Sequence, residues 1–169
     1  MMTDKISMCN NERYDKDVRN SLCHMRNIDA SDYWKTAQEC NVACNGGMNW
    51  HSGSEDFAKL LKGVGIPEEY AYKSYPMKLF FDAGVCFVNS SDRPCDGGTY
   101  YPFECMQIGV TCKGASDTEG YEWWPEERLT REQALLAMTI NGAYLVHAGN
   151  ERGSIAKGKL ADFLVKTVM

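Results

Sequence analysis

Short apolar runs alternate with helix-like stretches over most of the chain, and this order constrains the fold more than any other feature. The clearest run, residues 85–88, is short, apolar and partly β-branched, as expected of a buried strand. Two earlier runs, residues 18–25 and 41–44, are further strand candidates. Parallel strands need long connections, which helices usually supply, so this alternation predicts a parallel sheet with helical crossovers. The sequence therefore predicts an α/β fold.

The helix-like stretches are punctuated by caps and breakers. Gly84 has the character of a glycine that ends a helix, and Thr130 and Gln133 form a capping box that begins one. A long loop is expected over residues 113–127 and a turn with a final strand over residues 153–165. Helices are predicted for residues 32–39, 54–62, 70–83 after Pro76, 100–112, and the stretch that follows Thr130.

The composition excludes several functional classes. Lys and Arg number 18 against 23 Asp and Glu, a net charge of −5, and no basic run is present. This balance argues against a nucleic-acid partner. No apolar run approaches the roughly 18 residues that span a bilayer, and residues 1–10 lack the apolar centre of a signal peptide. The sequence predicts a cytoplasmic protein that binds neither nucleic acid nor membrane.

The eight cysteines are predicted to be reduced thiols, because disulfides need a secretory context that the sequence does not indicate. Cys40 and Cys44 are the closest pair, and no second close Cys/His pair follows to complete a zinc ribbon. A small zinc module built on this pair remains a weaker alternative.

Two polar residues follow predicted strands. His24 ends the first apolar run, and Asp92 lies just past the third. In parallel α/β folds the carboxyl ends of the strands form the functional site, which makes both residues candidates. Taken alone, each also fits a structural role in a turn or cap.

The last third of the chain shows a family resemblance. Residues 153–163 read G-S-I-A-K-G-K-L-A-D-F, and residues 126–135 read E-E-R-L-T-R-E-Q-A-L. With residues 139–143, these stretches resemble the end of the metal-dependent amidohydrolase superfamily, above all its amidohydrolase 3 group of N-substituted formamide deformylase-like proteins. Upstream segments resemble it too: Tyr75-Pro76, D-A-G-V at 82–85, S-D-R-P at 91–94 and H-M-R-N-I-D-A-S-D at 24–32.

This resemblance implies an architecture and a chemistry. Residues 1–150 would be the C-terminal portion of a TIM-like (β/α)8 barrel, and residues 151–169 a terminal strand segment of the flanking small β-sandwich. His24 matches the family's metal-binding histidine after strand six. Asp92 matches the strand-eight aspartate, which binds metal and takes the proton of the attacking water. The implied activity is metal-dependent hydrolysis of a non-peptide carbon–nitrogen bond, in an amide or formamide, of a small-molecule substrate, with zinc the expected divalent metal.

The loop after the second strand is the predicted source of substrate contacts: Asn45, Asn49, Trp50 and His51. For His51 two further interpretations stay open, a third metal ligand and a solvated loop histidine, and the solvated one is preferred. His147, near the end of the capped helix, is interpreted as structural because a cation there suits the helix dipole.

The chain also departs from the family pattern. Cys23 stands where Glu is frequent, Ser90 where Gly is usual, and Arg93 where Trp or a small residue is common. The family's His-x-His pair is not found among the three histidines. A full barrel needs about 250 residues. The sequence therefore predicts an incomplete metal site. A second chain that carries the front half of the barrel, or a homo-oligomer, would complete it.

A second function class is a non-catalytic binding or scaffold fragment that keeps part of the barrel. Aromatic pairs at Trp123-Trp124 and Tyr100-Tyr101 would supply its contact surface. The same residues also fit an ordinary core, which is the preferred interpretation.

Overall fold

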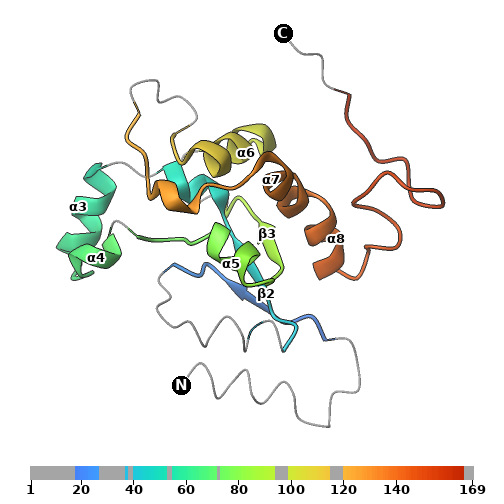
Figure 1. The fold of residues 1–169 in the computed structure, drawn as a ribbon, viewed down its shortest axis with the longest axis horizontal. Coiled ribbons are helices and arrows are strands. Elements are labelled where there is room, and N and C mark those ends of the chain that lie inside the picture. Colours follow the sequence, from blue (N-terminus) through green and yellow to red (C-terminus); the bar gives the residue numbers. More distant parts are fainter. Residues whose placement is uncertain are drawn as a thin grey trace.

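The computed structural model describes residues 18–26, 37, 40–52, 55–71, 73–93, 99–114 and 120–165. The helix expected over residues 32–39 lies, apart from Ala37, outside this part of the chain. The elements in chain order are β1 (Ser21–Cys23), β2 (Ala43–Gly46), η2 (Met48–Ser52), α3 (Glu55–Gly63), α4 (Glu68–Ala71), α5 (Lys78–Asp82), β3 (Phe87–Asn89), α6 (Pro102–Thr111), η3 (Pro125–Glu127), α7 (Arg131–Met138) and α8 (Ile140–Leu145), where η denotes a 3-10 helix (Figure 1).

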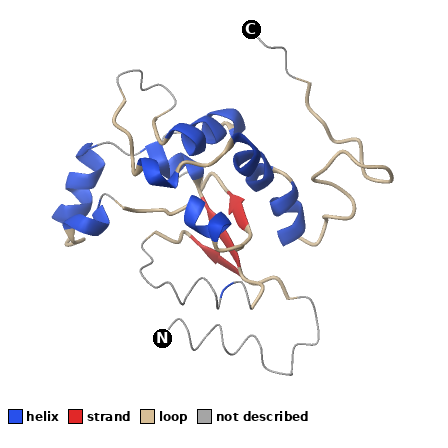
Figure 2. Ribbon diagram, in the orientation of Figure 1, coloured by secondary structure: helices blue, strands red, loops and turns tan. Residues whose placement is uncertain are grey.

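The described strands form one parallel sheet in the order β1-β2-β3 (Figure 2). Leu22 lies opposite Cys44, and Cys44 lies opposite Phe87. All three strands arise from the predicted apolar runs, so the expectation of an α/β fold with parallel strands is confirmed. Each strand ends at the same edge of the sheet, which brings the segments after β1, β2 and β3 together.

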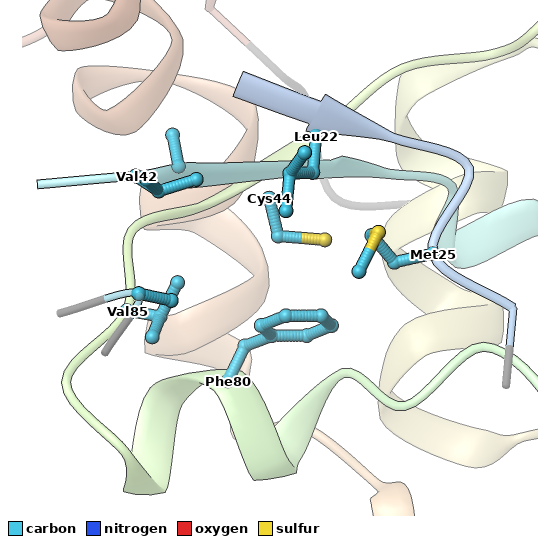
Figure 3. A pocket seen from close by; sticks show the side chains of 8 residues that line it. Leu22, Met25, Val42, Cys44, Phe80 and Val85 are labelled. Atoms are coloured by element: carbon cyan, nitrogen blue, oxygen red, sulfur yellow. The ribbon is translucent and has the colours of Figure 1, made fainter. Parts of the chain in front are cut away.

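Helix α5 covers one face of this sheet through Phe80, which is almost fully buried. Its ring lies 5.8 Å from that of Phe87, centroid to centroid. Figure 3 shows Phe80 facing Cys44 across a small apolar pocket. Burial raises the pKa of the Cys44 thiol well above its usual value. The pocket is lined by Leu22, Met25, Ala37, Val42, Ala43, Cys44, Phe80 and Val85.

Helices α7 and α8 pack beside β3, and α6 packs against η2 (Figure 1). The predicted capping box is present, with Thr130 Oγ1 accepting from the Gln133 amide at 3.1 Å and Gln133 Oε1 accepting from the Thr130 amide at 2.9 Å. Asn141 of α8 donates to the Phe87 carbonyl at 2.8 Å. That bond satisfies a carbonyl of β3, the last strand in the sheet order.

Several expectations are confirmed and one differs. Helix α3 forms where residues 54–62 predict it and extends one residue further, and helices also form within residues 70–83 and 100–112. Gly84 has the positive φ of a helix-ending glycine, +69°. Residues 160–165 form no strand; their side chains are exposed, Leu164 by 71% and Val165 by 81%. The apolar pattern there has no described strand to pair with, and a strand needs a neighbour to form.

The structure also bears on the cysteines, the two aromatic pairs and the length of the helices. The six cysteines in the described ranges, Cys40 and Cys44 among them, form no disulfide. Trp123 is fully buried, as preferred for the core interpretation, whereas Tyr100 and Tyr101 are 44% and 56% exposed. Among the described residues, no helix has the length and apolar character needed to cross a bilayer.

Candidate functional site at the carboxyl edge of the sheet

The carboxyl edge of the sheet gathers the segments that follow each strand. His24 comes directly after β1, η2 follows β2, and Asp92 comes three residues after β3. Backbone bonds hold these segments in place, because the His24 amide donates to the Asn45 carbonyl at 3.0 Å and the Ser90 amide to the Gly46 carbonyl at 2.8 Å. The sequence-predicted pair therefore converges in space.

His24 and Asp92 face each other directly. The Nδ1 atom of His24 lies 3.6 Å from Oδ2 of Asp92, and the two side chains are about half exposed, by 49% and 46%. Both residues have left-handed backbone angles, with φ of +57° and +54°. Such angles are costly for most residues other than glycine, so the surrounding fold must hold both residues in this conformation.

Tyr75 closes the other side of the His24 ring, a contact that the residue pattern alone did not predict. Its hydroxyl lies 3.0 Å from His24 Nε2, and the two rings meet edge to face at 5.1 Å. The Trp50 ring stacks on the Tyr75 ring, with 5.3 Å between the ring centroids. It also meets the His24 ring edge to face, again with 5.3 Å between centroids. Burial raises the pKa of Tyr75 to about 12, so its phenol stays protonated.

The backbone of Tyr75 is anchored from two sides. Its amide donates to the Arg26 carbonyl at 2.7 Å, and its carbonyl accepts from Nε2 of His51. His51 is fully buried, so the interpretation as a solvated loop histidine is wrong. Burial outweighs the hydrogen bond with Tyr75 and lowers the pKa of His51 to about 4, which keeps the ring neutral. His51 is enclosed and supports Tyr75 rather than facing a ligand.

A buried carboxylate sets the segment just beyond Tyr75. Glu127, 7% exposed, accepts from the Met77 amide at 2.7 Å and from the Leu79 amide at 2.9 Å through Oε2. These amides lie at the start of α5, where free N–H groups favour an anion. The residue pattern predicts nothing about Glu127, because its partners lie about 50 residues away in the chain.

The other predicted substrate contacts differ in their exposure. Asn49 is fully buried and donates to the Ser91 carbonyl at 3.0 Å, so it holds the loop that leads to Asp92. Asn45 and Trp50 are partly exposed at the edge, and Asn45 Nδ2 lies 3.7 Å from Cys23 Sγ. A direct substrate contact therefore stays a prediction for Asn45 and Trp50, while in this structure Asn49 and His51 are enclosed.

The pair also has the separation of two ligands on one metal ion. Two ligands about 2.1 Å from a tetrahedral zinc lie roughly 3.4 Å apart, close to the 3.6 Å between His24 Nδ1 and Asp92 Oδ2. Imidazole and carboxylate are both ordinary zinc ligands. No group of three or more His, Cys, Asp or Glu able to hold a metal occurs within the described ranges. The donors fit a metal but supply two ligands of a larger set.

One known protein family matches most of this chain. The amidohydrolase family model matches residues 47–166, which include Asp92 and the segments around Tyr75 and Glu127. The chain belongs to the amidohydrolase family.

Relatives of this amidohydrolase chain are considerably longer. An N-substituted formamide deformylase from Arthrobacter pascens is 40% identical over 93 residues, 55% of this chain and 16% of that protein. The protein LONG AFTER FAR-RED 3 from Arabidopsis thaliana is 27% identical over 111 residues, 66% of this chain and 18% of that protein. The chain thus spans less than a fifth of the length of either relative.

A solved structure shares the fold of this chain. It is an uncharacterized metal-dependent hydrolase from Pyrococcus furiosus, with a TM-score of 0.62 at 19% identity. The similarity covers 83% of this chain and 26% of that structure.

Proposed function

We propose that this chain is part of a metal-dependent hydrolase that cleaves a carbon–nitrogen bond in an amide or formamide. The observation that carries the proposal is the His24–Asp92 pair, 3.6 Å apart at the carboxyl edge of a parallel sheet. Membership of the amidohydrolase family and the 40% identity to an N-substituted formamide deformylase support the bond type and a small-molecule substrate.

His24 and Asp92 have distinct roles in this proposal. A bound divalent metal, with zinc expected, lowers the pKa of water toward about 7 and polarises the carbonyl. His24 Nδ1 and Asp92 Oδ2 would hold that metal. The Asp92 carboxylate also accepts the proton of the attacking water and returns it to the leaving amine. Asn45 and Trp50, partly exposed beside the pair, would contact the substrate.

The remaining metal ligands come from residues outside the described part of the chain, in the same protein or in a second chain. In this proposal residues 1–150 are a portion of a TIM-like barrel, residues 151–169 are the C-terminal strand segment of the flanking small β-sandwich, and the protein works in the cytoplasm. The exposed apolar side chains of residues 160–165 support the second part, because they offer a surface for strand pairing.

Zinc titration by calorimetry tests the proposal. We expect weak zinc binding by the full chain that is abolished in His24→Ala and in Asp92→Ala. His147→Ala is the matched control, since His147 lies just past α8, outside the segments that directly follow the three strands, and it should bind zinc as the wild type does. Retention of zinc in both site variants would refute the pair as ligands. Zinc lost instead with Cys40→Ala or Cys44→Ala would identify a cysteine site, and no zinc at all would favour the non-catalytic scaffold.

A further inference from the structure

Tyr75 is unusually constrained for a residue outside any helix or strand. Its side chain is 4% exposed, although it lies beside two half-exposed residues at the sheet edge. Its φ of +62° is left-handed, a conformation that a bulky aromatic residue adopts only when its surroundings impose it. The surroundings here are the Arg26 carbonyl, the buried His51 ring and the stacked Trp50 indole.

These constraints all set the position of one atom, the Tyr75 hydroxyl oxygen. That oxygen meets His24 Nε2 at 3.0 Å, while Nδ1 on the opposite side of the ring meets Asp92. Trp50 contacts both rings, so the imidazole can neither flip nor tilt freely. A phenol can donate or accept a hydrogen bond, but it is the stronger donor, and without a metal it therefore favours the neutral imidazole whose Nε2 carries no proton.

The geometry points to Tyr75 as the positioning residue of His24. The Tyr75 hydroxyl forms a hydrogen bond with Nε2 and thereby holds the ring with Nδ1 facing Asp92. This inference rests on the proposed function, in which Nδ1 is a metal ligand. Without metal, the Asp92 carboxylate favours the proton on Nδ1, and Tyr75 donates to Nε2. With Nδ1 engaged by a metal, the proton lies on Nε2 and Tyr75 accepts it. Outer partners of this kind fix the ring and the tautomer of a ligating histidine.

The tautomer of His24 can be measured without any metal. The full chain, labelled with 15N-histidine, is studied by two-bond 1H–15N correlation at about pH 8, where a free imidazole is neutral. We expect mainly the Nδ1–H form in the wild type, and a fraction of the Nε2–H form that rises about threefold or more in Tyr75→Phe, which removes one hydrogen bond. Asp92→Asn should shift the ratio in the same direction.

Matched controls separate this role from a general loss of packing. Tyr144→Phe removes a phenol that donates to Asn41 Oδ1 at 2.6 Å, away from the site, and should leave the His24 ratio unchanged. The signals of His51 and His147 in the same spectra report whether each variant keeps the fold. An unchanged His24 ratio in Tyr75→Phe, with those reference signals intact, overturns the inference.

Zinc addition to the same samples distinguishes this inference from the proposed function. We expect zinc to shift the Nδ1 signal of His24 in the wild type, and affinity to fall by about tenfold in Tyr75→Phe. No zinc binding by the wild type would refute the metal site, whereas the metal-free ratio would still decide the role of Tyr75. If the wild type and Tyr75→Phe bind zinc with equal affinity and have equal His24 tautomer ratios, the positioning role of Tyr75 is refuted while the metal site stands.

Discussion

The fully buried His51 ring makes the fold sensitive to acid in a way that can be calculated. Its pKa is about 4 in the folded chain, and an exposed histidine in the unfolded chain titrates near 6.5. Between these values the unfolded chain binds more protons, so the free energy of unfolding falls as the pH falls. Above about pH 6.5 the contribution is complete, and below about pH 4 about 3 kcal/mol has been lost.

Urea denaturation at about pH 7.5 and about pH 5, followed by tryptophan fluorescence, measures this loss. Carboxylates titrate in the same range, so the comparison needs a variant that removes the His51 contribution alone. His51→Gln keeps an N–H donor for the Tyr75 carbonyl but does not titrate. We expect the wild type to lose about 2 kcal/mol more than His51→Gln between the two pH values. Equal losses, within about 0.5 kcal/mol, would refute the argument that the ring is buried in its neutral form.

Two further predictions use matched pairs in the same denaturation assay. Gly47→Ala should lower the free energy of unfolding by about 1–3 kcal/mol, because the new Cβ would collide with Asn49 Oδ1 and lie 2.7 Å from Cδ1 of Trp50. Gly63→Ala at the end of α3 meets nothing within 4 Å and should instead stabilise by up to about 1 kcal/mol; the same sign for both variants would contradict the steric reasoning. Glu127→Gln should cost about 1–3 kcal/mol through its weakened bonds to the start of α5, whereas the exposed neighbour Glu126→Gln should change stability by less than about 0.5 kcal/mol. Equal effects in that pair would show that the buried carboxylate is not needed.

The elements that sequence reasoning predicts well are those with strong local signals. The apolar run before Asp92 forms a strand because a short buried stretch has few alternatives in a parallel sheet. The run before His24 forms a largely exposed strand that pairs with β2 at one end of the described sheet. The capping box at Thr130 forms because its two hydrogen bonds lie within four residues of each other. Placement of His24 beside Asp92 follows from topology, since parallel strands end at one edge.

The parts that sequence reasoning missed depend on contacts distant in the chain. Tyr75 reaches His24 across 51 residues, and Glu127 reaches Met77 across 50. The polar neighbours of His51 in the chain predict a solvated side chain, yet the fold buries it against the backbone of Tyr75. The strand expected at residues 160–165 shows the opposite case, a correct apolar pattern without a described strand to pair with.

The left-handed backbone angles of His24, Tyr75 and Asp92 have a consequence for laboratory evolution. Each such angle costs on the order of 1 kcal/mol relative to glycine. A library selected for heat resistance alone would therefore enrich glycine or asparagine at the half-exposed His24 and Asp92, since both tolerate the conformation. At Tyr75 the packing lost with a buried ring outweighs the relief of the backbone angle, so the tyrosine would be kept. The substitutions at His24 and Asp92 would remove the imidazole and the carboxylate of the site. Thermostability screens of this protein will lose side chains of the candidate site unless ligand binding is selected at the same time.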